Sequence, residues 1–458
     1  MPRIPRIVIA ATQSGSGKTT LVTGILAALR ERGLSPQSFK VGPDYIDPGY
    51  HQLASGRPGH NLDSWLVPPE VLREIFIRRA ASSDLAVVEG VMGLYDGGRR
   101  GVSSTAEVAK LLDAPVLLVI DAKSMGASAA ALAMGFRDYD PEVRLAGVLL
   151  NRLGSPTHEA MIVEALKPLG IPVLGAVRRE EGLSLPERHL GLLPIEENRE
   201  QEVVTRIGKA IGSQVKLDEI LWLAWEAPPL ETSPKTMKQS FSGRKKVRIA
   251  LARDEAFSFY YPESLEVFRA YGAEILEFSP LRDPVPPEAD GMIFGGGFPE
   301  MFAETLSRND SMRQSIRRSA EEGMPIYGEC GGFMYLMERL KDFSGKEFPM
   351  VGALPGSAAM TKKLQMVGYV TAQLREDTIL GPRGRSFRGH EFHFSLEPET
   401  APSCSRAFTF TRLRNGAVYP AGYVKGNVMG SYLHLHFAGC PEAAGDFVEA
   451  CRKFRKEG

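Results

Sequence analysis

Two short segments of this chain combine residue types that are suited to chemistry. The segment Ser14–Thr20, with the sequence SGSGKTT, contains a lysine and two threonines in a glycine-rich stretch. Such a loop can hold phosphates with its backbone N–H groups and a helix N-terminus, while the lysine and a hydroxyl reach phosphate oxygens and Mg²⁺. The segment Gly328–Gly332, GECGG, sets a thiol among glycines. The pair predicts nucleotide chemistry in one half of the chain and nucleophilic catalysis in the other.

The phosphate loop departs from its usual pattern at one position. Thr12 stands where the motif GxxxxGK[ST] has its first glycine. The segment nevertheless follows an apolar run and opens a helical pattern, which is the context that the motif requires. The alternative is a glycine-rich turn with a chance lysine and threonine. Partition-type ATPases carry an extra lysine where this chain has Gln13, which disfavours that class.

Residues after later strands are expected to complete the nucleotide site. Glu89 ends an apolar run, as a metal-binding acid of a nucleotide site does. Lys40, Asp44 and Asp47 follow another strand, where phosphate, Mg²⁺ or substrate would lie. For the two aspartates a turn beside proline is an equally open explanation. Asn151 ends a further strand and is expected to read the base, unless it is only a turn residue.

The expected ligands of nucleotide and metal can be stated together. Those for ATP are Gln13, Ser14, Gly15, Ser16, Gly17, Lys18, Thr19, Thr20, Lys40 and Asn151. Those for Mg²⁺ are Thr19, Asp47 and Glu89.

The thiol segment has the layout of a nucleophile elbow. An apolar strand ends at Tyr327, glycines flank Cys330, and an apolar helical pattern follows. The helix N-terminus is expected to favour the thiolate of Cys330. Backbone N–H groups of Gly296, Gly297 and Gly331 are expected to form an oxyanion hole. The alternative for Cys330 is a small buried residue in a tight turn.

A catalytic thiol also needs a base, and histidine is the expected type. Histidines cluster in two places of this half, Gly389–His393 and Ser431–His436. The residues alone do not choose between these clusters. Their paired histidines also raise the alternative of a metal site, although no thiolate-rich or HExxH spacing accompanies them.

The bulk composition favours small-molecule partners. The 55 basic residues balance 55 acidic ones, so no net field would hold nucleic acid or an anionic membrane. The four cysteines are irregularly spaced, which argues against a disulfide framework and a zinc ribbon. The apolar run near the start is shorter than a signal-peptide core or a membrane span. We therefore expect a cytoplasmic protein with reduced thiols, no nucleic-acid partner and no membrane partner.

The chain is expected to form two α/β domains, because its 458 residues exceed a single core. In residues 1–226, apolar runs alternate with helical patterns, which predicts a doubly wound parallel sheet that carries the phosphate loop. Residues 227–245 are polar and interrupted by prolines, as in a linker. Residues 246–458 repeat the α/β pattern and, beyond Val367, change to short alternating runs that are typical of hairpins.

Taken as a set, these motifs are similar to those of the cobyrinic acid a,c-diamide synthases of cobalamin biosynthesis. The likeness spans essentially the whole chain and is carried by the phosphate loop, Lys40–Pro48, Asn61–Asp63, Glu89–Gly93, Gly295–Glu300, Gly328–Gly332, Gly389–His393 and Ser431–His434. It implies a dethiobiotin-synthetase-like ATP domain followed by a class I glutaminase domain. It also implies candidate positions for a substrate loop, which are Asp44, Tyr45, Asp47, Asn61 and Asp63.

The resemblance implies roles in the second domain. Cys330 would be the glutaminase nucleophile and His434 the residue that activates it. Ordinary class I glutaminases have a glutamate two residues after this histidine, whereas this chain has His436. Either a Cys–His dyad suffices, or another group orients His434.

The implied reaction couples the two domains. Cys330 attacks the side-chain amide of glutamine and releases ammonia, Mg·ATP phosphorylates an acetate carboxylate of a tetrapyrrole, and ammonia displaces the phosphate. Repetition at the a and c side chains gives the diamide; a homodimer is left open. Relatives of this family act on nickel-sirohydrochlorin, hydrogenobyrinic acid or sirohydrochlorin, so the macrocycle is open as well. From another class, the alternative is a partition-type ATPase switch whose glutaminase half is inert.

Overall fold

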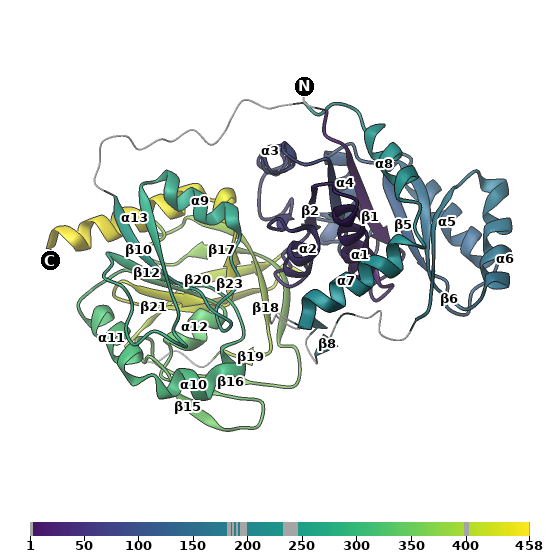
Figure 1. Ribbon diagram of the computed structural model, residues 1–458. Coiled ribbons are helices and arrows are strands. Elements are labelled where there is room, and N and C mark those ends of the chain that lie inside the picture. Colours follow the sequence, from purple (N-terminus) through teal and green to yellow (C-terminus); the bar gives the residue numbers. More distant parts are fainter. Residues whose placement is uncertain are drawn as a thin grey trace. The chain divides into compact units, whose positions relative to one another are not determined.

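The computed structural model describes residues 3–180, 185, 187–188, 191–192, 199–231, 246–397 and 403–457. These residues form two compact units (Figure 1). The first unit holds the described residues up to Ser64 and from Pro68 to residue 231. The second holds Trp65–Val67 and the described residues from 246 onward. Most of the expected linker, residues 232–245, lies outside the described residues.

The first unit is built on a seven-stranded parallel sheet with the strand order β3-β2-β4-β1-β5-β6-β7. The strands are β1 Arg6–Ala11, β2 Pro36–Val41, β3 His60–Leu62, β4 Leu85–Glu89, β5 Val116–Asp121, β6 Leu145–Leu153 and β7 Val173–Arg178. Strands lie on both sides of β1 and are joined by crossovers, so the polar residues at their carboxyl ends gather along one edge. The structure therefore confirms the predicted doubly wound sheet.

Helices and short turns connect these strands. They are α1 Lys18–Glu31, α2 Asp47–Ser55, α3 Pro69–Ala80, η1 Arg99–Gly101, α4 Thr105–Leu111, α5 Ser128–Tyr139, α6 Pro156–Leu166, η2 Lys167–Leu169, α7 Arg199–Gly212 and α8 Leu217–Trp225. A short antiparallel pair, β8 Glu187–Arg188 and β9 Gly191–Leu192, also belongs to this unit. Ile9 of β1, Leu26 of α1 and Ile207 of α7 are fully buried in one apolar core.

The second unit contains a ten-stranded sheet with the order β11-β10-β12-β13-β22-β21-β20-β17-β18-β23. Its strands are β10 Val247–Ala252, β11 Ala273–Phe278, β12 Gly291–Phe294, β13 Ile326–Glu329, β17 Met366–Leu374, β18 Ser386–His393, β20 Ser405–Arg412, β21 Val418–Lys425, β22 Val428–Ser431 and β23 Leu433–Leu435. The pairs from β11 to β22 are parallel, and those from β22 to β23 are antiparallel. The predicted hairpin strands thus extend the parallel sheet.

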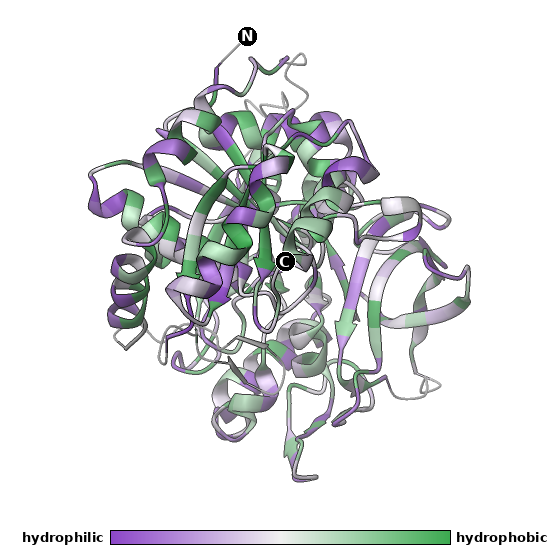
Figure 2. Cartoon of the chain, turned by 90° about the vertical axis from the view of Figure 1, so that its right-hand side faces the viewer, coloured by the Kyte–Doolittle hydropathy of each residue, from purple (hydrophilic) through white to green (hydrophobic). Residues whose placement is uncertain are grey.

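The helical elements of the second unit are α9 Pro262–Ala270, η3 Pro299–Phe302, α10 Ala303–Arg308, α11 Asp310–Glu321, α12 Gly331–Leu336, η4 Phe437–Gly439 and α13 Pro441–Glu457. A small sheet that the sequence did not predict contains β14 Arg339–Lys341, β15 Glu347–Pro349, β16 Ser357–Met360 and β19 Ser395–Leu396. Figure 2 shows hydrophobic residues concentrated on the inner strands, whereas the helices around them carry both hydrophobic and hydrophilic residues. Within the described part of the chain, no helix has the length and apolar character needed to cross a bilayer.

Candidate active sites

The phosphate loop lies between β1 and α1, as its motif predicts. Residues 13–15 are exposed at its tip, and α1 begins at Lys18 with neither an acidic residue in its first turn nor a side-chain cap. The first N–H groups of the helix are therefore suited to hold an anion. Lys18 Nζ donates to Met92 O at 2.6 Å. Burial and the charge of Lys40 lower the pKa of Lys18 to about 8.

Gly17 shows why this loop needs glycine. Its φ is 83°, in the left-handed region, and a Cβ added there would lie 2.4 Å from Asn151 Nδ2. Asn151, near the end of β6, donates from Nδ2 to Ser16 O at 2.8 Å. Asn151 thus helps to hold the phosphate loop. This role differs from both expectations from the sequence, a contact with the base and a turn residue. The contact of Asn151 with a base stays a prediction.

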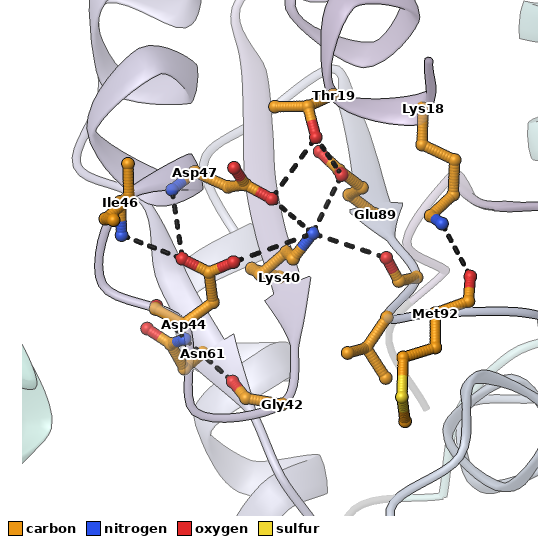
Figure 3. Close-up of polar contacts among 12 residues, drawn as sticks. Lys18, Thr19, Lys40, Gly42, Asp44, Ile46, Asp47, Asn61, Glu89 and Met92 are labelled. Carbon is orange, nitrogen blue, oxygen red and sulfur yellow. Dashed lines mark hydrogen bonds and ion pairs between the residues drawn. The ribbon is translucent and has the colours of Figure 1, made fainter. Parts of the chain in front are cut away.

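Side chains from four elements meet beside the phosphate loop (Figure 3). Lys40 Nζ, from β2, lies 2.5 Å from Asp47 Oδ2 of α2 and 2.8 Å from Glu89 Oε1 of β4. Thr19 Oγ1 of α1 donates to Glu89 Oε1 at 2.8 Å and lies 3.3 Å from Asp47 Oδ2. The three expected Mg²⁺ ligands are therefore close together, and the ammonium of Lys40 lies between the two carboxylates.

Burial makes the charges of this cluster depend on one another. Burial opposes the ionisation of Glu89, but Lys40 and His51 outweigh it and hold the pKa of Glu89 well below its usual range. Burial also opposes the charge of Lys40, but Asp47 and Glu89 outweigh it and raise the pKa of Lys40. Burial and the nearby Asp44 raise the pKa of Asp47. Three carboxylates thus face one buried lysine, an arrangement that favours an additional cation.

The positions of the expected substrate loop lie around the turn from β2 to α2. Asp44 Oδ1 accepts two backbone N–H groups of this turn at 2.8 and 3.1 Å, so the turn interpretation holds for Asp44. Its Oδ2 lies 4.0 Å from Lys40 Nζ. Asn61 donates to two carbonyls of the same turn, at 2.8 and 2.6 Å, and so helps to shape it. Tyr45 is half-buried and Asp63 is buried.

The thiol segment has the geometry of the expected elbow. Cys330 stands between β13 and α12 with φ 47° and ψ −103°, a conformation that is strained for any residue other than glycine. Its N–H donates to Ser431 O at 2.8 Å, which joins the elbow to β22. Its Sγ lies 3.7 Å from Phe392 O. Strain at a thiol points to a functional position, because a residue that only packs does not need it.

The glycine loop after β12 lies directly against this elbow. A Cβ on Gly331 would lie 3.0 Å from Gly297 N, so the two backbone segments approach closely. A Cβ on Gly297 would lie 2.0 Å from Ala256 O, and one on Gly296 would lie 2.7 Å from His434 Cε1. The three glycines of the predicted oxyanion hole are therefore brought together, and side chains at these positions would collide with their surroundings.

His434, on β23, faces a buried carboxylate. Its Nδ1 lies 3.9 Å from Oε2 of Glu329, the residue before Cys330. His436, at the position of the usual glutamate, stacks on Tyr261 with ring centroids 4.5 Å apart, and its Nδ1 accepts a backbone N–H at 3.3 Å. Burial lowers the pKa of His436 to about 4, so the ring is neutral near pH 7. His436 therefore does not supply the negative charge of a triad.

At Cys330 the expected influence of the helix N-terminus is present, but burial outweighs it. Burial raises the pKa of Cys330 above its usual value, and three nearby carboxylates add to the rise. These are Glu300, Glu329 and Glu391. The N–H of Gly331 acts in the opposite direction, but α12 has only six residues and its N-terminus does not outweigh burial. The thiol is therefore protonated at rest and depends on a base.

The two histidine clusters of this half lie on paired strands. His390 of β18 stands directly opposite His434 of β23, and His393 stacks on Tyr432 with centroids 3.9 Å apart. Burial lowers the pKa of both His390 and His393 to about 4. Among the residues that the structure describes, no group of three or more His, Cys, Asp or Glu side chains is placed to hold a metal.

Two buried residues of these sites, His51 and Glu329, were not expected from the sequence to take part in them. His51 Nε2 lies 2.7 Å from Glu89 Oε2. Its position four residues after Asp47 on one helix was the signal that could have found it. Glu329 faces His434 only because of the way distant strands pair, so no local pattern could have indicated it.

Family models match both halves of the chain. Residues 7–193 match the CobQ/CobB/MinD/ParA nucleotide binding domain. Residues 248–441 match the CobB/CobQ-like glutamine amidotransferase domain. The two matches agree with the two kinds of site described above.

Curated relatives match the chain over nearly its whole length. It is 44% identical over 459 residues to the cobyrinate a,c-diamide synthase of Dehalococcoides mccartyi, covering 98% of this chain and 99% of the relative. It is 45% identical over 441 residues to the cobyrinate a,c-diamide synthase of Listeria innocua, covering 94% and 96%. It is 43% identical over 489 residues to the hydrogenobyrinate a,c-diamide synthase of Streptomyces coelicolor, covering 98% of each. With both domains matched as well, the chain belongs to the family of cobyrinate and hydrogenobyrinate a,c-diamide synthases.

Proposed function

We propose that this protein is an ATP-dependent, glutamine-hydrolysing ligase that amidates the a- and c-acetate carboxylates of cobyrinic acid. The names of its full-length relatives and its two matched domains support this proposal. The observation that carries it is the presence on one chain of a phosphate loop beside a buried Lys40–Asp47–Glu89 cluster and of a strained thiol elbow beside His434. The first site suits phosphoryl transfer, and the second suits the release of ammonia from an amide.

In the glutaminase half, Cys330 Sγ adds to the side-chain carbonyl carbon of glutamine while His434 takes the thiol proton. The N–H groups of the glycine loop and of Gly331 stabilise the oxyanion. The C–N bond then breaks, the proton held by His434 passes to the departing nitrogen, and ammonia leaves a thioester behind. Water hydrolyses the thioester to glutamate and restores the thiol.

In the nucleotide half, a carboxylate oxygen of the macrocycle attacks the γ-phosphorus of ATP and gives an acyl phosphate and ADP. Ammonia attacks the acyl carbon, phosphate leaves, and an amide forms. A carboxylate is a poor electrophile, so the phosphoryl group supplies the leaving group that the reaction needs. Lys18 and the N-terminus of α1 hold the transferred phosphates. A second cycle on the other acetate gives the diamide.

The residues beside the phosphate loop fit Mg²⁺. Thr19, Asp47 and Glu89 offer a hydroxyl and two carboxylates, which are the hard oxygen donors that this ion prefers, and the hydroxyl lies within hydrogen-bonding distance of both carboxylates. When bound there, Mg²⁺ supplies positive charge to the β- and γ-phosphates.

The proposal is tested by a reaction that contains Mg·ATP, cobyrinic acid and glutamine labelled with heavy nitrogen in its side-chain amide. We expect mass spectrometry to find both label atoms in one doubly amidated product, with ADP and glutamate formed alongside. Amidated product without label would show that the amide nitrogen does not come from glutamine and would contradict the coupling of the two sites. The absence of any amidated product in the presence of ATP hydrolysis would overturn the choice of acceptor.

Hydrogenobyrinic acid is the second candidate substrate, because the relative named for it is 43% identical over nearly the full chain. Comparison of kcat/KM for the two macrocycles, with nickel-sirohydrochlorin and sirohydrochlorin as further acceptors, decides among them. The relatives that match this chain over nearly its whole length are named as synthases, so they give no support to a partition-type switch.

We place this activity in the cytoplasm, where free ATP and glutamine are found. The four cysteines, all of which are described, form no disulfide, which fits a reducing compartment. A homodimer stays a prediction that analytical ultracentrifugation tests.

A further inference from the structure

We propose that Glu329 positions His434 and supports its positive charge, in place of the glutamate that ordinary class I glutaminases have two residues after the histidine. The inference rests on the glutaminase half of the proposed function. It answers the question that His436 raises, because His436 faces Tyr261 and takes no part in orienting His434.

The carboxyl group of Glu329 is held in one orientation by its own contacts. Tyr327 Oη donates to Oε1 at 2.9 Å, and the N–H of Leu435 donates to the same oxygen at 3.2 Å. With Oε1 held twice, Oε2 is the oxygen that faces His434, 3.9 Å from Nδ1. The side chains of Glu329 and His434 are only 9% and 4% exposed, so water screens this interaction little.

The position of Glu329 in the chain joins the nucleophile to its base. Glu329 ends β13 and is bonded covalently to Cys330, while its hydrogen bond to Leu435 reaches the residue after His434 on β23. One carboxyl group thereby sets the distance between two strand ends that are far apart in the sequence. Because Nδ1 of His434 faces the carboxylate, Nε2 is left as the nitrogen that can take the thiol proton.

Other ionisable groups face this pair, and they decide how it responds to charge. Those that interact with Glu329 are Tyr260, Tyr327, Cys330 and Cys440, and those that interact with His434 are His390 and His393. None of these groups is a cation at neutral pH, because burial lowers the pKa of both neighbouring histidines to about 4. Burial raises the pKa of Glu329 to about 8 and lowers that of His434 to about 3. Near pH 7 the carboxyl group of Glu329 is therefore mostly protonated and His434 is neutral at rest. Transfer of the thiol proton to His434 creates a buried cation 3.9 Å from this carboxyl group, which favours the ionised form of Glu329.

The first test compares two substitutions of Glu329. Glu329→Gln keeps the shape and the acceptor oxygen for Tyr327 and Leu435 but cannot become negatively charged, and we expect kcat for glutamine hydrolysis to fall about 100- to 1000-fold. Glu329→Asp retains an ionisable carboxyl group on a shorter side chain, and we expect at least about tenfold more activity than in the glutamine variant. Glu397→Gln is the matched control, because it changes another buried carboxylate of this unit whose partner is Arg406, and glutamine hydrolysis is expected to be unchanged.

The second test separates positioning from simple charge proximity. Iodoacetamide alkylation of Cys330, followed by peptide mass spectrometry over a pH series, reports the pKa of the thiol. If proximity were the whole effect, removal of any of the three neighbouring carboxylates would lower this pKa, because each of them raises it. We expect that result for Glu300→Gln and Glu391→Gln. For Glu329→Gln we expect the same lower thiol pKa, because His434 is neutral when the free thiol ionises. What sets this variant apart from the other two is its loss of kcat, because it alone removes the group that faces the imidazolium formed during turnover.

The kcat and the thiol pKa of Glu329→Gln together decide the proposal. A lower thiol pKa in Glu329→Gln, together with kcat within threefold of the unsubstituted protein, overturns the proposal and leaves Glu329 as a buried acid. Circular dichroism and the thermal transition of each variant show whether it folds.

Tyr327→Phe is a second variant, and it leaves the carboxyl group of Glu329 in place. It removes one donor to Oε1, so we expect a loss of less than about tenfold if charge is the main contribution. Failure of the unsubstituted protein to hydrolyse glutamine would count against the proposed function, whereas the alkylation profiles would still show whether Glu329 interacts with the Cys330 thiol.

Discussion

Removal of the Lys40 ammonium tests how the nucleotide site holds its charges. Lys40→Met preserves most of the side-chain volume but leaves Asp47 and Glu89 without the cation that now lies 2.5 and 2.8 Å from them. The side chain of Lys40 is 5% exposed and that of Glu89 is fully buried, so solvent compensates little for the loss.

The size of the effect follows from these distances. At an effective dielectric constant of about 20, each contact contributes about 6 kcal/mol of Coulomb attraction, most of which offsets the cost of burying the charges. Breaking a buried pair by removing one partner typically costs about 3 to 5 kcal/mol. For a unit of this size that loss lowers Tm by roughly 10 °C.

Differential scanning calorimetry measures this loss, since the two compact units can give separate transitions. Lys110→Met is the matched control, because Lys110 also contacts two carboxylates, Asp140 at 2.7 Å and Glu142 at 3.3 Å, but at the surface. Exposed pairs contribute little, so we expect the control to lose less than about 1 kcal/mol.

Addition of MgCl₂ makes the test specific for the proposed metal ligands. In the Lys40→Met variant the ion no longer competes with an ammonium for Asp47 and Glu89, so we expect Mg²⁺ to raise its Tm more than that of the unsubstituted protein. Two results would refute the reasoning. One is a Lys40 variant as stable as the Lys110 variant, and the other is an equal response of both proteins to Mg²⁺.

Three further predictions concern single positions. Cys330→Ala is expected to abolish glutamine-dependent amidation and to retain amidation with ammonium salts, measured by product mass; loss of both activities would contradict the division of labour. Gly17→Ala is expected to weaken ATP binding at least tenfold in calorimetric titration, since its φ is 83° and Asn151 would be 2.4 Å from the new methyl, whereas Gly170→Ala, with a φ of 66° and no atom within 4 Å, should bind ATP normally. Burial lowers the pKa of His436 to about 4 in the folded protein, whereas the unfolded chain binds a proton there below about pH 6.5. The contribution of this residue to the free energy of unfolding is therefore complete above about pH 6.5 and is lost as the pH falls toward 4. Urea unfolding should therefore show His436→Phe gaining about 2 kcal/mol relative to the unsubstituted protein between pH 7 and pH 5, and equal pH dependences would refute this.

Much of the fold could be predicted because its signals are local. The continuous apolar runs at Ile7–Ala11 and Val116–Ile120 became β1 and β5, and the alternating run at Val367–Leu374 became most of β17. Each pattern reports the burial of its own segment, which does not depend on the rest of the chain. The joining of antiparallel strands to the parallel sheet could not be predicted, since it depends on which edge remains unpaired after folding.

The sites divide in the same way. Glycines and a lysine at fixed spacing indicated the phosphate loop, and glycines around Cys330 indicated the elbow, because backbone conformation demands these residue types. The position of Lys40 between two carboxylates and the approach of Glu329 to His434 depend on the pairing of distant strands. The sequence could not show that burial outweighs the short helix at Cys330, because burial depends on the whole fold.

The most direct test of the proposed reaction is to incubate purified protein, Mg·ATP and glutamine with cobyrinic acid, hydrogenobyrinic acid or nickel-sirohydrochlorin in separate reactions and to identify the products by mass spectrometry. We expect a doubly amidated cobyrinate whose formation requires both ATP and glutamine. Diamidation of nickel-sirohydrochlorin alone, or hydrolysis of ATP and glutamine with no macrocycle amidated, would contradict it.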